Sequence, residues 1–493
     1  TEQAVMAFHA QRLHASVTPE GTSANFVTNG LPPVPGVPFA DPCIDDAGRA
    51  TGTARTIKAA VLQTDATFNK SGWHFPQWRM LAHQDDVDDY LSGARAPEPF
   101  FMRAHSGDCI TYQHTNLVPA AYEQDDFQIF TPTDILGQHI HLVKFDVTSS
   151  DGSGNGWNYE DGTFSPGEVM ERIEAINAAG GLISDDDGER DDEDERRVLH
   201  PEAHPYFGVF GAQTTIQRWW ADPLLNAQGK DRTIRTVFTH DHFGPSTHQQ
   251  AGLYAGLLIE PAGTSWRHPE SGAALGTRHD GGPTSWRADI LTSDAQASYR
   301  EFMFMHQDFH LAYTKDNVAV NPPGRVEAPL PFLFDRPPVP NPEAISADDV
   351  GTMSVNYRNE PLAMRLRDPA TNTQPTDAAG DTGHAYRNLT RKDADYNKQP
   401  GFYPPLTADV NPLDPFTPIL RAYEGDKVLI RFMQGATEEG HNFTVSGLRW
   451  QHEADDPTSR FKNSEMNAIS EHFELDLGRL PAISANRADY LYM

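Results

Sequence analysis

The sequence predicts an all-β protein that consists of two β-sandwich halves with long loops and one inserted helix. Short runs rich in β-branched and aromatic residues recur along the 493 residues, and 38 Gly and 38 Pro lie between them, as expected of many strands joined by turns. Most runs are about five to eight residues long, the usual length of a strand. The expected strands are 56–63, 109–114, 139–147, 233–239, 253–260, 301–305 and 427–432.

One segment departs from the β pattern. Residues 165–168, Ser-Pro-Gly-Glu, form a capping box with Pro at the first helical position. Val169, Ile173 and Ile176 follow at helical spacing, and the Gly pair at 180–181 ends the run. We therefore expect a helix between 166 and about 179.

Polar stretches divide the chain. The Pro- and Gly-rich segment 262–284 separates two β-rich halves, and Gly-Asp precedes an expected strand in each half, at 107–108 and 425–426. Two copies of one sandwich would explain this internal repeat. We interpret Thr1 and Met493 as cuts in a longer polypeptide. The expected organisation is an extended segment 1–52, a first sandwich 53–263 with an acidic insertion near 150–215, a linker 264–284, and a second sandwich 285–493 that is incomplete at its C-terminal end.

Charge and composition exclude some partners. The formal charge of -30 repels phosphate-rich partners, so we expect no nucleic-acid binding. The same charge attracts metal cations, or serves only to keep a large protein soluble. No apolar run approaches the roughly 20 residues that cross a bilayer, so no membrane span is expected. Cys43 and Cys109 form one disulfide or are two unrelated thiols, and they leave the compartment undecided.

Two pairs of histidines stand out by their spacing. Of the 21 histidines, only His139 with His141 and His240 with His242 form His-x-His pairs. On a strand, residues i and i+2 point to the same face, so two imidazoles can reach one metal or two adjacent metals. Imidazole ligands suit copper, iron, nickel and zinc. Because both pairs fall on expected strands of one sandwich, we expect them to converge from neighbouring strands.

The context of these pairs resembles the multicopper oxidase family. The stretch 238–243, Phe-Thr-His-Asp-His-Phe, is followed at 252–261 by Gly-Leu-Tyr-Ala-Gly-Leu-Leu-Ile-Glu-Pro, which resembles a His-x-His strand and the next strand of that family's first domain. The stretch 109–116 followed by Gly-Gln-His-Ile-His at 137–141 resembles the domain's other His-x-His strand. The resemblance implies tandem cupredoxin-like Greek-key β-sandwich domains.

The resemblance also implies a cofactor. In that family four His-x-His pairs hold a trinuclear copper cluster that reduces dioxygen to water, so His139, His141, His240 and His242 would supply half of a type 2/type 3 cluster. Another cupredoxin domain or chain would supply the other half. In the second half, the stretch 439–447 is similar to the family's His-x-x-His-x-His strand, but Thr444 and Ser446 replace two histidines. There His441 stands at the position of a mononuclear-copper ligand, and no His-Cys-His exists.

Three further histidines are weaker candidate ligands. His248 follows the second pair in a loop, His114 ends the expected strand near the first pair, and His441 is interpreted more readily as a core residue. His306 and His310, four apart, are expected to be structural because the surrounding pattern is that of a strand. Whether Asp241, in the middle of the second pair, has a role of its own is left open.

We therefore expect a copper-dependent oxidase, a multicopper oxidase or part of one, that couples oxidation of a small reductant to reduction of dioxygen. The resemblance to large bacterial multicopper oxidases, some of them manganese-oxidising, adds a metal ion such as Mn(II) as a candidate substrate and implies a periplasmic or extracellular location. The alternatives are a non-catalytic copper-binding or scaffold cupredoxin protein, and a mononuclear metal-dependent hydrolase.

Overall fold

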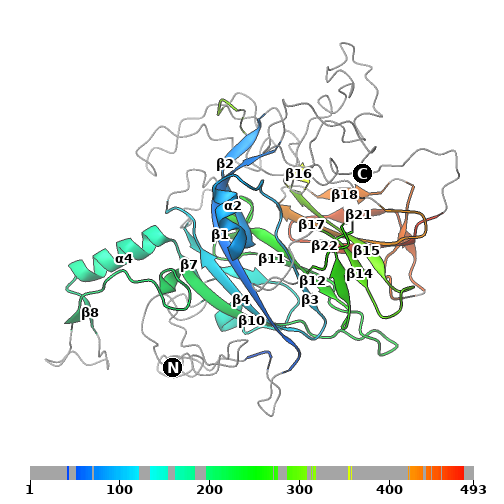
Figure 1. Ribbon diagram of the computed structural model, residues 1–493, viewed down its shortest axis with the longest axis horizontal. Helices are drawn as coiled ribbons and strands as arrows, with labels where there is room; N and C mark the ends of the chain where they lie inside the picture. Colours follow the sequence, from blue (N-terminus) through cyan, green and yellow to red (C-terminus); the bar gives the residue numbers. More distant parts are fainter. Residues whose placement is uncertain are drawn as a thin grey trace.

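The structure is a computed structural model. It describes residues 41–43, 51–68, 72–120, 134–153, 161–183, 196–269, 271–275, 286–307, 313, 315–317, 354–355, 357, 420, 422–436, 440–445, 447–456 and 458–481. Within these residues β-strands in sheets dominate and helices are few, which confirms the all-β prediction (Figure 1).

The first half contains two four-stranded sheets. The first sheet has the order β10 (Thr214–Trp220), β4 (Cys109–Asn116), β1 (Ala54–Thr67), β2 (His74–His83). The second sheet has the order β3 (Phe101–His105), β12 (Tyr254–Glu260), β11 (Thr236–Asp241), β6 (Gln138–Ile140). Apolar side chains of both sheets, such as Ile57, Trp219, Val237 and Leu257, form one buried core between them. The expected β-sandwich is thus present here.

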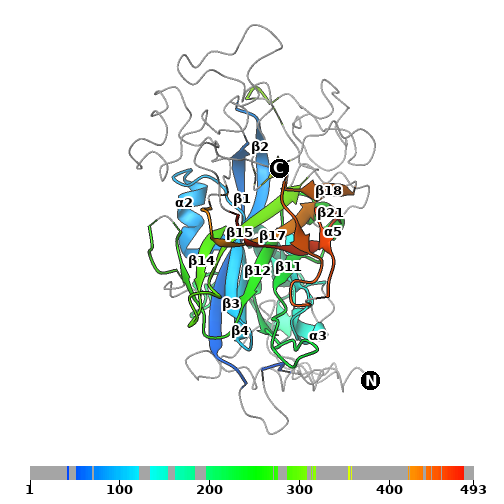
Figure 2. The same ribbon diagram turned by 90° about the vertical axis from the view of Figure 1, so that its right-hand side faces the viewer.

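A third sheet belongs to the second half of the chain. Its order is β13 (Ser265–Arg267), β14 (Arg287–Leu291), β15 (Tyr299–Gln307), β17 (Lys427–Ala436), β22 (His472–Arg479), and β16 (Ser354–Val355) pairs with β15. In Figure 2 its strands cross in front of the nearly vertical β1 and β4. Strand β13 lies inside the segment expected as a linker, so residues 265–267 belong to this sheet; the other domain boundaries stay predictions.

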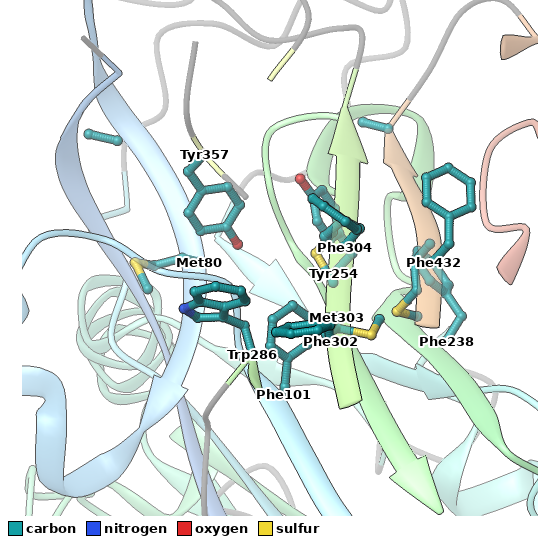
Figure 3. Packing of buried hydrophobic residues seen from close by; sticks show 14 of the residues in the cluster. Met80, Phe101, Phe238, Tyr254, Trp286, Phe302, Met303, Phe304, Tyr357 and Phe432 are labelled. Atoms are coloured by element: carbon teal, nitrogen blue, oxygen red, sulfur yellow. The ribbon is translucent and has the colours of Figure 1, made fainter. Parts of the chain in front are cut away.

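The second and third sheets share a core. Figure 3 shows Phe101, Phe238 and Tyr254 of the second sheet among Met303, Phe304 and Phe432 of the third. The packing is close at Gly256 of β12, where an added Cβ would lie 3.0 Å from Sδ of Met433. The second sheet, which carries both histidine pairs, is therefore covered on both faces. Because each buried apolar side chain contributes about 1.5–3 kcal/mol, this core fixes β11 firmly.

Four buried charges join the same two sheets. Arg103 of β3 and Glu260 of β12 meet Glu301 of β15 and Arg431 of β17, and all four side chains are at most 2% exposed. Arg103 lies 3.0 Å from Glu260, Arg431 lies 3.1 Å from Glu260 and 2.5 Å from Glu301, and Arg103 also pairs with Glu301. Two cations and two anions neutralise one another, which is how buried charges are tolerated.

The predicted helix is confirmed as α4 (Pro166–Ala178). The side chain of its N-cap Ser165 accepts a hydrogen bond from the backbone N–H of Glu168 at 3.0 Å, Val169 is buried, and Ile173 packs against the same small cluster. The remaining helical elements are short: α2 (Val87–Leu91), α3 (Val147–Ser150), α5 (Pro245–His248), η2 (Gln84–Asp86) and η4 (Gly211–Gln213).

Small two-stranded sheets complete the fold. They are β5 (Ile135–Leu136) with β7 (Thr163–Phe164), β8 (Leu182–Ile183) with β9 (Arg196–Arg197), β18 (His441–Thr444) with β21 (Ser464–Asn467), and β19 (Trp450–Gln451) with β20 (Phe461–Lys462). Much of the acidic insertion, residues 184–195, lies outside the described residues. None of the described helices is long and apolar enough to span a membrane.

The two cysteines form one disulfide, so the second of the two alternatives left open by the sequence is wrong. Cys43 and Cys109 are joined with their Cα atoms 5.7 Å apart, and both are buried. The bond links the segment before β1 to the start of β4.

Candidate metal centre

The structure brings the two predicted histidine pairs together. His139 of β6 and His240 of β11 stand directly opposite each other in the antiparallel register, and His141 and His242 follow the ends of these strands. The ring centres lie 4.3 Å apart for His139 and His242, 5.3 Å for His139 and His240, and 5.3 Å for His141 and His240. Two imidazoles on one metal, each at about 2 Å, have ring centres roughly 5 to 6 Å apart. These four residues are called the histidine cluster below.

Two expected strands are wrong in extent. Strand β11 begins at Thr236 rather than 233, because Thr233 and Arg235 take φ values of 60° and 65°. Strand β6 ends at Ile140 rather than continuing to 147, because the chain bends there and Leu142 takes a φ of 60°. His141 therefore reaches the cluster from a bend. Its ring remains 5.2 Å from that of His139.

Hydrogen bonds fix which nitrogen each ring presents. Nδ1 of His240 lies 2.7 Å from its neighbour's carbonyl oxygen, that of Asp241. Nδ1 of His139 and Nδ1 of His242 each lie 3.0 Å from the carbonyl oxygen of Asp151. A carbonyl oxygen only accepts, so these Nδ1 atoms carry the protons and the Nε2 atoms keep their lone pairs. Three rings thus present Nε2 as the free ligand atom, as metal-binding histidines do.

Asp151 is a residue of this site that the sequence reading missed. Besides its carbonyl oxygen, its carboxylate lies 3.0 Å from Nδ1 of His242 and 3.3 Å from Nδ1 of His139. Asp151 immediately follows α3 in a tight loop, where a Cβ on Gly137 would lie 1.9 Å from the carbonyl oxygen of Gly152. Only an Asp-Gly turn signal marks this loop in the sequence, and it does not reveal the contact.

The protonation state of two of the four imidazoles, those of His141 and His240, suits metal binding. Burial and the neighbouring imidazoles lower the pKa of His141 to about 3, and burial lowers the pKa of His240 to about 4. The hydrogen bond to Asp151 raises the pKa of His242. Burial opposes ionisation of Asp151, but its hydrogen bonds with His139 and His242 hold the pKa of its carboxyl group well below the usual range. Neutral His141 and His240 are ligands without losing a proton.

The third sheet adds a fifth imidazole that the sequence reading also missed. The ring of His472, at the start of β22, lies 6.3 Å from the ring of His141. Burial lowers the pKa of His472. Nothing local to the sequence marks this residue, because its position results from the packing of the third sheet on β11.

The three weaker candidates lie elsewhere. His248 is buried, and its Nδ1 lies 2.9 Å from the Asp241 carboxylate. His114 lies in the core between the first two sheets, 3.3 Å from the hydroxyl of Tyr112, and burial lowers its pKa to about 4. His441 begins β18 in the second half. None of these three has a ring contact with the histidine cluster within the described residues.

The expected structural role of His306 fits its surroundings. It is buried on β15, and its ring lies 4.6 Å from Phe432 and 5.5 Å from Phe443. His310 and Ser446 lie outside the described residues.

No family model and no curated protein matches the sequence. Among solved structures, the chain is similar to a multicopper oxidase, with 12% identity, a TM-score of 0.38, and 89% of this chain and 83% of that chain covered. It is similar to the copper nitrite reductase from Nitrosomonas europaea, with 10% identity, a TM-score of 0.36, and coverage of 87% and 85%. For the blue copper oxidase from the same organism the identity is 10%, the TM-score 0.35, and the coverage 86% and 76%. These likenesses are remote.

Proposed function

We propose that this chain is part of a copper-dependent oxidase of the multicopper type, and that its histidine cluster holds copper as half of a centre that reduces dioxygen to water. The observation that carries the proposal is the convergence of four imidazoles on one spot, three of them with Nδ1 engaged by oxygen acceptors. Bound copper would supply the one-electron redox chemistry that reduction of dioxygen requires.

The chain's own residues would prepare this site. Asp151 holds the His139 and His242 rings, and burial keeps His141 and His240 neutral. The side chain of His242 is 33% exposed, so one side of the cluster is open. We propose that another cupredoxin domain or chain supplies the remaining ligands from that side.

The proposed substrate and location each have one supporting observation. The resemblance of the His-x-His segments is the sole support for a small reductant or a metal ion such as Mn(II) as the electron donor. The disulfide supports a periplasmic or extracellular location, because such bonds persist in oxidising compartments.

A copper-binding or scaffold protein without redox turnover is the second candidate, and one observation favours it. The chain has two cysteines, and both are consumed by the disulfide. No thiolate of this chain is therefore left to form a mononuclear blue copper site that would take electrons from a substrate.

Copper loading of the full chain separates these functions. We expect more than one copper per chain after loading and desalting, and loss of this copper in the double variant His139→Ala/His240→Ala. His268→Ala/His452→Ala, which removes two histidines outside the cluster, is the control. Oxygen uptake with a small reductant, measured on the chain together with the domain or chain that completes the centre, supports the oxidase. One bound copper without oxygen uptake supports the second candidate, and no copper bound overturns both.

A further inference from the structure

Asp241 stands between the two histidines of the second pair but faces away from them. On β11, His240 and Phe238 face the third sheet, whereas Val237 lies in the core between the first two sheets. Alternation along the strand directs Asp241 into that core, where it is 2% exposed. A buried carboxylate is costly unless it is hydrogen-bonded, so its partners show what it does there.

Those partners come from the segments that carry both histidine pairs. Oδ1 of Asp241 accepts a hydrogen bond from the backbone N–H of Gly137 at 2.9 Å, and Oδ2 accepts one from the backbone N–H of Gly244 at 2.8 Å. Gly137 precedes His139 by two residues, and Gly244 follows His242 by two. One carboxylate thus ties together the backbone on either side of the cluster.

A third partner orients the carboxylate. Nδ1 of His248, at the end of α5, donates to Oδ2 of Asp241 at 2.9 Å, and the His248 side chain is 1% exposed. His248 is held in turn by backbone bonds of its N–H to the carbonyl of Gly244 at 2.7 Å and of its carbonyl to the N–H of Leu253 at 3.0 Å. The backbone of Gly244 and Leu253 therefore holds His248 in place beside Asp241.

A neighbouring polar layer serves the same backbone. Oγ1 of Thr239 donates to the carbonyl oxygen of His139 at 2.5 Å, and Nε2 of Gln217 donates to the carbonyl oxygen of Gln138 at 2.6 Å. The face of the second sheet beneath the cluster is thus occupied by hydrogen bonds to the strands that carry it. Such outer partners fix the orientation of metal ligands.

We propose that Asp241, oriented by His248, is the positioning residue that sets the spacing between the two histidine pairs. This inference rests on the proposed copper-binding function and deepens it. His248 is then not a metal ligand, and Asp241 acts through the backbone rather than by contact with metal. Loss of an outer partner of this kind lowers metal affinity about 10- to 100-fold.

The test compares Asp241→Ala with Asp108→Ala in the full chain. Asp108 is also a buried carboxylate of the first half, but it accepts from Arg55 and the backbone N–H of His105, away from the cluster. Two quantities are measured: Cu(II) affinity with the electron paramagnetic resonance spectrum, and hydrogen exchange of peptides 135–141 and 240–248 in the metal-free protein. His248→Ala and His248→Gln form a second pair, because the Gln amide can still donate to Asp241.

We expect Asp241→Ala to weaken Cu(II) binding about 10- to 100-fold, to alter the spectrum, and to speed exchange in both peptides. Asp108→Ala should change none of these, and His248→Gln should restore most of what His248→Ala loses. A folded Asp241→Ala protein with wild-type affinity, spectrum and exchange would overturn the inference. If Asp241→Ala does not fold, equal behaviour of the two His248 variants overturns it. If the wild type binds no copper, the proposed function fails, and the exchange data alone decide whether Asp241 positions the pairs.

Discussion

The ring of His139 lies 4.3 Å, centre to centre, from the ring of His242, and both direct Nδ1 to the single residue Asp151. These histidines belong to different His-x-His pairs. One loop residue therefore couples the orientation of both pairs, and a change at Asp151 should affect the whole cluster.

We expect Asp151→Asn to weaken Cu(II) binding about 10- to 100-fold, because the neutral amide lacks the negative charge with which the carboxylate strengthens its contacts to both imidazole N–H groups. Affinity is measured by competition with a chelator of known strength. Asp456→Asn, a change at an exposed turn residue, serves as control and should leave the affinity unchanged. Equal affinities for wild type and Asp151→Asn would show that the Asp151 contacts do not serve the site.

Removal of a single member of the buried charge cluster should destabilise the protein strongly. Replacing Glu301 with Ala leaves Arg103 and Arg431 with only part of their compensation, so the free energy of unfolding should fall by about 3–5 kcal/mol. Urea denaturation followed by tryptophan fluorescence measures this loss. Glu453→Ala breaks an exposed pair with Arg232 and should cost about 0–1 kcal/mol. Similar losses for the two variants would contradict the expected difference.

His306 should make the protein sensitive to acid. Burial, with the nearby His441, lowers the pKa of His306 to about 3, whereas the unfolded chain has a value near 6.5. Between these values the unfolded state binds a proton that the folded state does not, so stability falls as the pH drops below about 6.5.

His306→Phe should remove this contribution, about 1.4 kcal/mol per pH unit between roughly pH 6 and pH 4. The Phe ring suits the surroundings, because the imidazole already packs against Phe432 and Phe443. Denaturation midpoints at several pH values measure the slope, with exposed His452→Gln as control. An unchanged slope in His306→Phe would show that this residue does not carry the effect.

Opening the disulfide should destabilise the first half without emptying the cluster. Removing the Cys43–Cys109 link frees a closed loop and should lower the free energy of unfolding by about 2–5 kcal/mol. The variant Cys43→Ser/Cys109→Ser is compared with wild type in denaturation and copper binding. Loss of copper from a still-folded variant would show that the disulfide also supports the histidine cluster.

The sequence predicts the parts of this molecule that local pattern controls. The capping box at 165–168 specified α4, and β-rich runs located β1, β4, β11, β12, β15 and β17. The spacing of His139, His141, His240 and His242 was enough to predict their convergence.

Contacts that depend on tertiary packing could not be predicted from the sequence. Asp151 and His472 reach the cluster from a loop and from the third sheet, and no local pattern reports that proximity. The bend after Ile140 was missed because the β-rich run continues past it. The role of Asp241 required knowing which amides lie opposite it.

The second sheet, buried on both faces, has a consequence for protein engineering. Residues 53–263 taken alone would expose Phe101, Phe238 and Tyr254 to water and leave Arg103 and Glu260 without the counterions supplied by Glu301 and Arg431. Residues 53–263 therefore cannot be transferred alone to another protein. A host scaffold would have to replace the whole surface of the third sheet that now covers them.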